Sequence, residues 1–484
     1  MDTKKLRQKI LDLAIRGKLV PQDPSDEPAS VLLERILAEK ERLIAEGKIK
    51  RPKKSKASSS ESHYQNFEPP FEIPASWQWA QVNDITTSIL YGVSESAKSQ
   101  GEYKLLRITD IQDNSVNWAN VPYTDFNKNK AAQYLLQNGD IVFARTGATV
   151  GKSYLVDSVP SNSMYASYLI RIRTNEEILP EYLKIFFEST FYWQQIIEGT
   201  VGIGQPNVNG TSLGLLWLPI PPRNEQRRIV SNTQDLTLNV TSMEYSKKAI
   251  NESIIQIKSK ILELAMQGKL VPQDSSDEPA AAMLRRINPN AKIITDNPHS
   301  TNIPQTWSIC RLGDIVRISS AKRVMKSDWQ SQGVPFYRTR EIVKLSDYGT
   351  VDNELFISHE QYEEFKKQYG IPKRGDIMLT AVGTIGKTYI VKSNDKFYYK
   401  DASVLCLSPT SIVSSDFLEI LFKDENLIKQ MKGNSKGTTV DTITIEKANN
   451  YLIVLPPLIE QTRIVAKIEE LYSVLDKIEA SLQS

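Results

Sequence analysis

Cysteine is scarce in this sequence, and its positions argue against a disulfide or metal framework. The 484 residues contain two cysteines, Cys310 and Cys406, both in the second half. By the internal alignment described below, the matching positions of the first half hold Ala80 and Arg171. Neither a disulfide framework nor a repeated metal site is therefore indicated. We interpret Cys310 and Cys406 as two unpaired structural thiols.

Histidine, long hydrophobic runs and strong net charge are also missing. His63, His299 and His359 have no counterparts between the halves, which argues against a repeated histidine-based catalytic centre. No apolar run approaches the roughly 18 residues of a membrane span. Residues 1–6 lack the apolar stretch of a secretory signal, so we expect a cytoplasmic protein with no membrane partner. Because the net charge is only +3, any binding to nucleic acid is expected to use local basic patches.

The sequence does contain an internal repeat. Residues 9–36 align without a gap on residues 260–287, and 20 of 28 positions are identical. Both segments contain the string GKLVPQD, at 17–23 and at 268–274. Chance does not produce such a match, so the chain is an internal duplication.

The repeat continues as short motifs in the same order in both copies. Each copy begins with an Ile-Pro pair and a tryptophan, contains Gly-Asp-Ile, and ends with Pro-Pro followed by Glu-Gln. These motifs are Ile73-Pro74, Trp77, Gly139-Asp140-Ile141, Pro221-Pro222 and Glu225-Gln226 in the first copy, and Ile303-Pro304, Trp307, Gly375-Asp376-Ile377, Pro456-Pro457 and Glu460-Gln461 in the second. The two modules therefore have nearly equal length.

The first copy carries about 20 extra residues before its module, in a lysine-rich and serine-rich stretch near 48–60. Such a charged run is typical of a solvated linker or a helix end, and a contact to DNA phosphate is the alternative.

Long helices follow each module. Apolar residues recur there with the alternating spacing of three and four that defines a heptad seam, interrupted at Thr233 and Lys247. A segment of about 40 residues with this spacing predicts a helix on the order of 60 Å long. The seam residues are Ile229, Leu236, Val240, Met243, Ile250, Ile254, Ile257, Ile261 and Leu264 in the centre, and Ile464, Ile468, Leu471, Leu475, Ile478 and Leu482 near the C-terminus.

The two chain ends together correspond to one copy of the central helix. Leu6, Ile10 and Leu13 match central seam positions at an offset of 251, and the C-terminal seam stops where the N-terminal one begins. This pattern indicates a circularly permuted duplication with a pseudo-twofold axis, in which two seams pack antiparallel. Two surface helices packed separately on their own modules are the alternative.

Two motifs look catalytic but are better explained as structure. Residues 147–153 resemble a phosphate-binding loop, which needs four residues between its glycines; three lie between them here and two in the counterpart, residues 383–388. We interpret both as glycine turns between strands. Glu68-Pro69-Pro70-Phe71 echoes the motif of amino-methyltransferases, but glutamate is the wrong first residue. Residues 202–207 also break the pattern of a glycine-rich loop for a methyl donor.

Together, these motifs and their duplicated order resemble the specificity subunit of type I restriction-modification enzymes. The resemblance covers nearly the whole chain and rests on the GKLVPQD elements, the Ile-Pro…Trp openings, the Gly-Asp-Ile strands with their Gly-Lys turns, and the Pro-Pro…Glu-Gln closings. It implies two target-recognition domains that each read one half of a split double-stranded DNA sequence. The helices would set the spacing and bind two methyltransferase subunits.

The resemblance also implies that this chain has no catalytic centre and no cofactor of its own. S-adenosylmethionine, ATP and Mg would belong to partner subunits, which methylate adenine and, where a restriction subunit is present, translocate and cleave DNA. A degenerate DNA adenine methyltransferase and a duplicated scaffold that binds no DNA are the alternatives.

The expected fold is α+β, with two mixed α/β target-recognition domains joined by long antiparallel coiled-coil helices. The expected segments are an N-terminal helical region and linker at 1–67, the first target-recognition domain at 68–222, a central region at 223–302, the second domain at 303–457, and a C-terminal helix at 458–484.

Candidate DNA-binding residues are cations at aligned positions. Arg107 and Arg338 end matching strands, and Thr109 stands opposite Arg340 as a point of difference between the half-sites. Internal pairing of Arg107 and Arg338 with acids three residues later is the alternative.

Further cations lie on turns and on one strand. Lys152 and Lys387 follow the glycine turns and are candidates for phosphate contacts. Arg171 and Arg173 share a strand face by alternation, but the second copy holds Cys406 and Ser408 there. We expect Arg171 and Arg173 to read bases of the first half-site; two solvated side chains are the alternative. The most divergent stretches, 112–135 against 343–371 and 157–212 against 392–447, should carry the differing base contacts.

Overall fold

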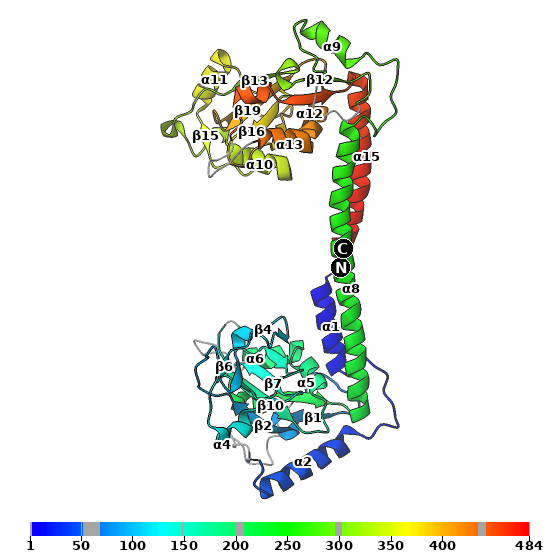
Figure 1. Ribbon diagram of the computed structural model, residues 1–484, viewed down its shortest axis with the longest axis vertical. Coiled ribbons are helices and arrows are strands. Elements are labelled where there is room, and N and C mark those ends of the chain that lie inside the picture. Colours follow the sequence, from blue (N-terminus) through cyan, green and yellow to red (C-terminus); the bar gives the residue numbers. More distant parts are fainter. Residues whose placement is uncertain are drawn as a thin grey trace. The chain divides into compact units, whose positions relative to one another are not determined.

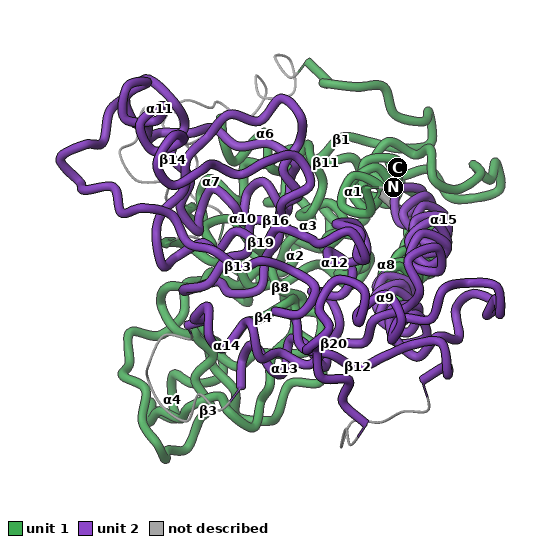
Figure 2. Tube along the Cα trace, turned by 90° about the horizontal axis from the view of Figure 1, so that it is seen from above, with its two compact units in different colours: residues 1–247 green, residues 248–484 purple. Residues whose placement is uncertain are grey.

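One helix of 44 residues, α8 (Arg223–Met266), runs from the first part of the chain into the second (Figure 1). It confirms the long helix predicted from the heptad pattern. The computed structural model describes residues 2–49, 51, 68–147, 149–198, 208–295, 303–433 and 442–483. Contacts divide the chain into two units, residues 1–247 and 248–484, coloured separately in Figure 2.

Unit 1 combines helices with a module of strands. A four-stranded antiparallel sheet, in the order β2-β10-β7-β8, forms its centre, and β1 pairs with β11 so that the ends of the module meet. The strands are β1 Gln78–Gln81, β2 Thr86–Tyr91, β3 Tyr103–Leu106, β4 Ile111–Gln112, β5 Ser115–Val116, β6 Tyr123–Thr124, β7 Ile141–Ala144, β8 Ser153–Leu155, β9 Ser163–Tyr165, β10 Leu169–Thr174 and β11 Trp217–Ile220. The helices before α8 are α1 Thr3–Ile15, α2 Ala29–Ala45, α3 Val82–Ile85, α4 Lys128–Ala131, α5 Pro180–Phe186, α6 Thr190–Glu198 and α7 Gly210–Gly214.

Unit 2 repeats this plan. Its central sheet has the order β13-β19-β16-β17, and β12 pairs with β20. The strands are β12 Ser308–Arg311, β13 Val316–Ser320, β14 Val334–Tyr337, β15 Phe356–Ile357, β16 Ile377–Thr380, β17 Thr388–Ile390, β18 Tyr398–Tyr399, β19 Val404–Pro409 and β20 Leu452–Leu455. The helices are α9 Ala280–Ile287, α10 Thr339–Tyr348, α11 His359–Gln368, α12 Ser415–Leu421, α13 Glu425–Met431, α14 Ile445–Asn449 and α15 Leu458–Gln483.

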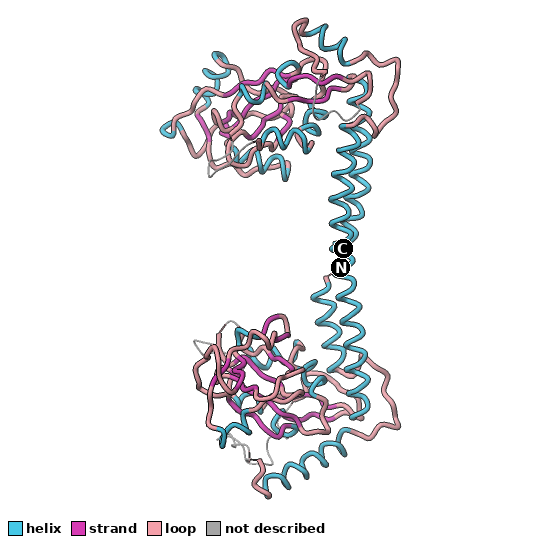
Figure 3. Tube along the Cα trace, viewed as in Figure 1, coloured by secondary structure: helices cyan, strands magenta, loops and turns pink. Residues whose placement is uncertain are grey.

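The matching sheet orders confirm the duplication in three dimensions. In both units the strands gather in one module beside the long helices (Figure 3). The modules differ where the sequences diverge: residues 339–368 contribute α10 and α11 in unit 2, whereas unit 1 has the β4-β5 hairpin and the short helix α4.

The glycine turns are confirmed as connections between strands. Gly147 and Gly151 lie between β7 and β8, and Gly383 and Gly386 lie between β16 and β17. All four have φ between 80° and 82°, a left-handed conformation that glycine adopts without steric cost.

Helix α8 has a packing partner in each unit (Figure 1). In unit 1, Arg7 on α1 donates hydrogen bonds to Thr241 Oγ1 at 2.8 Å and Glu244 Oε2 at 2.9 Å on α8. In unit 2, Lys258 on α8 contacts Asp476 on α15 at 2.7 Å, and Tyr472 donates to the Lys258 carbonyl at 3.0 Å. The helices also pack on their modules, because Ile229 of α8 belongs to the hydrophobic core of the first module.

The seam residues divide by exposure. Those buried in their own unit are Ile229, Val240, Ile254, Ile261, Ile464, Ile468 and Leu475. Those that are partly exposed are Leu236, Leu264, Leu471 and Leu482. Those that are exposed are Met243, Ile250, Ile257 and Ile478. No helix in the described part of the chain is long and apolar enough to span a lipid bilayer.

Candidate nucleic-acid interface

One edge of each central sheet collects four strand ends. Because neighbouring strands are antiparallel, the last residues of β2 and β7 meet the first residues of β8 and β10. We call this the strand-end edge and define it by Tyr91, Arg145, Lys152 and Tyr168 in unit 1 and by the matching residues Ser320, Ala381, Lys387 and Ser403 in unit 2.

The structure brings most of the predicted DNA-binding residues to this edge or next to it. The amide of Ala166 donates to the Leu106 carbonyl at 2.9 Å, which places Arg107 beside the residues leading into Tyr168. In unit 2 the Thr339 hydroxyl donates to the carbonyl oxygens of Val382 and Ser403 at 3.3 and 3.2 Å, which holds the start of α10 against the edge.

Arg107 and Arg338 each make an internal ion pair. Arg107 Nε and Nη2 donate to Asp110 at 3.1 and 2.8 Å, and Arg338 makes the matching bonds to Glu341 at 3.1 and 2.9 Å. Pairing raises the pKa of Arg107, through hydrogen bonds to Asp110. The Arg107 side chain stays 42% exposed and the Arg338 side chain 27% exposed, so each pair presents its cation at the surface.

The remaining predicted cations differ in their partners. Arg340 is shared between Glu341 at 3.0 Å and Glu354 at 2.7 Å, whereas its counterpart Thr109 is uncharged. Lys387 pairs with Asp347 at 2.5 Å. Lys152 is exposed, and none of the described carboxylates lies within 4.0 Å of its ammonium group.

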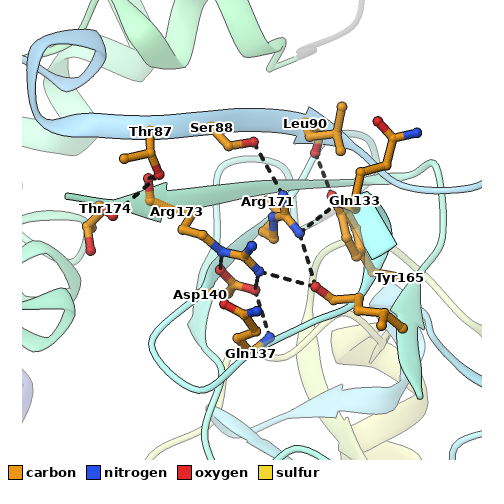
Figure 4. A network of polar contacts seen from close by, with 11 residues as sticks. Thr87, Ser88, Leu90, Gln133, Gln137, Asp140, Tyr165, Arg171, Arg173 and Thr174 are labelled. Carbon is orange, nitrogen blue, oxygen red and sulfur yellow. Dashed lines mark hydrogen bonds and ion pairs between the residues drawn. The ribbon is translucent and has the colours of Figure 1, made fainter. Parts of the chain in front are cut away.

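Arg171 lies inside the module (Figure 4). It is 2% exposed, and its Nη1 donates to the carbonyl oxygens of Gln133 and Leu135 at 3.1 and 3.2 Å, while Nη2 donates to Ser88 Oγ at 3.3 Å. Burial lowers the pKa of the Arg171 guanidinium. This geometry opposes the expected base contact and gives Arg171 a structural role, because both of its Nη groups bond within the module.

Arg173 lies on the same strand face and is also engaged. Its Nε and Nη2 donate to the two carboxylate oxygens of buried Asp140 at 2.7 Å each (Figure 4). Asp140 belongs to the repeated Gly-Asp-Ile motif, and its counterpart Asp376 faces the thiol of Cys406 at 3.6 Å. The residue opposite this aspartate therefore changes between the copies.

Sequence reasoning missed a buried polar joint that fastens each module to its helix. Trp77 Nε1 and Gln22 Nε2 donate to the Glu225 carboxylate at 2.9 and 2.5 Å. Arg228 Nη2 donates to Asp26 at 2.5 Å. The same joint occurs in unit 2 among Trp307, Gln273, Glu460, Arg463 and Asp277. The signal was present, because all of these residues lie in the repeated motifs at matching positions.

Burial dominates the electrostatics of the joint. It raises the pKa of Glu225 and of Glu460, and the hydrogen bonds from tryptophan and glutamine oppose the shift. The repeated amides Gln226 and Gln461 lie next to these acids and are fully buried; Gln226 accepts from the Leu179 amide at 2.9 Å and Gln461 from the Ser414 amide at 2.9 Å.

Phe71, the last residue of the motif Glu68-Pro69-Pro70-Phe71, has a packing role, whereas the first three residues are exposed. The Phe71 ring lies 5.1 Å from Trp79 and 5.3 Å from Phe191, and the Arg16 guanidinium covers it at 4.4 Å. Cys310 and Cys406 are free and buried, as expected. Among the described residues, no group of three His, Cys, Asp or Glu side chains could hold a metal ion. Most of the lysine-rich stretch, residues 202–207, His63 and His299 lie outside the described residues.

Comparison with known proteins gives a consistent result. Residues 76–252 and 304–484 match the family described as type I restriction modification DNA specificity domain. The type I restriction enzyme EcoEI specificity subunit of Escherichia coli is 25% identical, with 99% of this chain and 91% of that protein covered. The EcoAI specificity subunit of Escherichia coli is 28% identical, with coverage of 98% and 90%.

Solved structures share the fold. The HsdS subunit from Thermoanaerobacter tengcongensis has a TM-score of 0.56 at 18% identity, over 86% of this chain and 93% of that one. A chain from a study of complex assembly and conformational transition of the type I R-M system has a TM-score of 0.56 at 20% identity, with coverage of 86% and 94%. With two matched family domains and long helices that pack together, this chain belongs to the type I restriction-modification DNA specificity family and is the non-catalytic specificity subunit of such a system.

Proposed function

We propose that the two modules, residues 68–222 and 303–457, each read one half of a split target in double-stranded DNA. The observation that carries this proposal is the duplicated strand-end edge, where Arg107 and Lys152 have the counterparts Arg338 and Lys387. Cations that reach the surface at equivalent places, three of them partly exposed and ion-paired and Lys152 exposed, suit phosphate contacts that position a protein on DNA, while nearby residues that differ suit base contacts. Two linked half-sites gain affinity through effective concentration.

The helices are proposed to dock the partner subunits. Six apolar residues of α8 and α15 in unit 2 are at least 40% exposed: Ile250, Ile255, Ile257, Ile459, Val474 and Ile478. Exposed apolar positions on paired helices are typical of sites that receive another helix or subunit. We propose that two methyltransferase subunits bind the regions 1–67, 223–302 and 458–484, which contain the long helices, and that restriction subunits are further members of the complex.

The proposed chemistry belongs to those partners. S-adenosylmethionine would bind to the methyltransferase subunits and supply the methyl group for adenine, and ATP with Mg would serve a restriction subunit. The residues of this chain would hold the DNA and select the site. The cytoplasmic location stays a prediction from the sequence.

A nuclease footprint of the chain bound to methyltransferase subunits tests the proposal. We expect two protected patches separated by a constant gap, because each module protects one half-site. A single continuous patch would contradict half-site reading, and no protection would favour the scaffold alternative. The isolated chain should not transfer methyl groups from S-adenosylmethionine to DNA; transfer by the chain alone would contradict the assignment of this chemistry to the partners.

A further inference from the structure

Arg145 stands apart from the other arginines near the strand-end edge of unit 1. Arg107 and Arg173 are paired with Asp110 and Asp140. No carboxylate of the described residues lies within 4.0 Å of the Arg145 guanidinium, and Arg145 Nε is buried without a hydrogen-bond partner among them. Arg171 Nε is also buried without such a partner, but the Nη groups of Arg171 donate to Gln133, Leu135 and Ser88, whereas the Arg145 guanidinium makes no hydrogen bond to the described residues. A guanidinium carries five N–H donors, and a donor left without a partner costs free energy unless a ligand supplies an acceptor.

The backbone and an aromatic ring hold Arg145 in place. Its amide donates to the Tyr168 carbonyl at 3.0 Å, and its carbonyl accepts from the Val208 amide at 3.2 Å. The guanidinium lies over the Tyr91 ring, 5.0 Å from the centroid. The Tyr91 hydroxyl accepts from the Gly210 amide at 2.8 Å, so the ring is itself anchored. These contacts fix the Arg145 backbone and restrict its guanidinium, which reduces the conformational entropy that Arg145 loses on binding.

Two aromatic side chains of the edge are accessible at the surface. Tyr168 is 62% exposed and Tyr91 is 37% exposed. Lys152, at the start of β8, is exposed on the same edge. An arginine between exposed tyrosines and a lysine matches the mixture of aromatic and cationic groups that contacts nucleic acid.

Unit 2 lacks this arrangement although its backbone is the same there. The strand registers place Ser320, Ala381 and Ser403 opposite Tyr91, Arg145 and Tyr168. The hydrogen bond from the Val208 amide to the Arg145 carbonyl also has a counterpart, from Ile443 to Ala381 at 2.8 Å. The two units therefore share the cations Arg107/Arg338 and Lys152/Lys387 at this edge and differ in three large side chains that unit 1 alone carries.

We propose that Arg145, held over Tyr91, reads a guanine in the half-site of the first module. The planar fork of arginine matches O6 and N7 on the major-groove edge of guanine in a fixed geometry, whereas lysine offers these atoms a single ammonium group on a flexible stem. The difference between the units at Arg145, Tyr91 and Tyr168 gives the two half-sites different sequences. This inference rests on the proposed half-site reading and names the residue that performs it in unit 1.

The test uses the full chain assembled with its methyltransferase subunits, with plasmid-library DNA as the probe and a map of methylated adenines as the measurement. Arg145→Ala is compared with Arg145→Lys, which keeps the charge but not the fork. We expect Arg145→Ala to relax one guanine position in one half of the motif, lowering discrimination there about 10- to 100-fold, and Arg145→Lys to relax the same position to a smaller extent. The other half of the motif should stay unchanged.

Lys152→Ala is the matched control on the same edge. As a phosphate contact, it should lower methylation at all sites alike and weaken the dependence on salt, without a change in the motif. Because Arg145→Ala removes a partly buried side chain, Arg145→Lys also provides the answer if the alanine variant fails to assemble.

Two results would overturn the proposal. One is an unchanged methylation motif in Arg145→Lys, combined in Arg145→Ala with either an unchanged motif or an equal loss of methylation at all sites. That result would make Arg145 a phosphate contact or a structural residue. The other is a position that relaxes in both halves of the motif. A wild-type motif that is not split would instead overturn the proposed half-site reading itself.

Discussion

Single residues fasten each module to its helix. Trp77 donates to Glu225 in unit 1, and Trp307 donates to Glu460 in unit 2, each at 2.9 Å and fully within the protein. We expect Trp77→Phe to lower the free energy of unfolding of unit 1 by about 1–3 kcal/mol, because a buried carboxylate loses a donor. Trp329→Phe is the control: that indole N–H is buried without a partner among the described residues, so its removal should cost less. Equal losses in urea unfolding would contradict the role of the hydrogen bond.

The same acids predict a pH dependence of stability. Burial raises the pKa of Glu225 and of Glu460 above the ordinary 4.5. The folded state then holds these protons more tightly than the unfolded state, so the stability they contribute is fully present below pH 4.5 and is lost as the pH rises through the raised pKa. The double variant Glu225→Gln, Glu460→Gln should therefore lose less stability over that range. Urea midpoints measured across it should differ in slope between wild type and variant; parallel curves would argue against the shift.

Arg171 is expected to act on stability and not on specificity. Arg171→Ala leaves the Gln133 carbonyl without its arginine donor and removes one of the two donors of the Leu135 carbonyl, the other being Arg173 Nη2 at 3.2 Å. We expect a loss of about 3 kcal/mol in the stability of unit 1. The methylated motif should stay the same, in contrast to Arg145→Ala. If Arg171→Ala kept the wild-type thermal stability but changed the methylated motif, this would contradict the structural role of the buried side chain in Figure 4.

The positions of some functional residues could be predicted from the sequence, whereas their contacts could not. The repeat register correctly placed Arg107 and Arg338 at matching strand ends, since alignment transfers position directly. Alternation correctly placed Arg171 and Arg173 on one face of β10. It could not show that residues 133–135 cover that face, because this contact joins segments about 36 residues apart. Arg145 was missed for the complementary reason: its counterpart is alanine, so no repeated motif marks it.

At the scale of elements, the heptad pattern predicted both α8 and α15, since apolar spacing is a local property of the sequence. The pattern could not separate buried from exposed seam positions, because the burial of each position depends on what packs against it. Ile468 is 3% exposed, whereas Ile478, on the same helix, is 43% exposed.

This difference predicts opposite effects of one substitution. Ile468→Asp places a charge in the hydrophobic core of unit 2 and should cost about 3 kcal/mol or more. Ile478→Asp should change the stability of the isolated chain by less than about 0.5 kcal/mol but weaken assembly with the methyltransferase subunit. Thermal unfolding and gel filtration measure the two effects. Equal destabilisation by both would contradict the packing described for unit 2.

For the whole molecule, duplication is the central feature. Two modules with the same sheet order carry the same cations at one edge and different side chains beside them. Sequence comparison of the two halves already indicated this organisation, because the repeated motifs mark the ends of both modules. The identity of the bases read by each module depends on side chains that the halves do not share, and so it did not follow from the repeat.

The most direct test of half-site reading replaces residues 303–457 by a second copy of residues 68–222 and maps the adenines methylated by the assembled complex. If each module reads one half of the target, the new motif should contain the half-site of the first module twice, with the spacer of the wild-type motif. A motif that still contains the second wild-type half-site would contradict half-site reading by the separate modules.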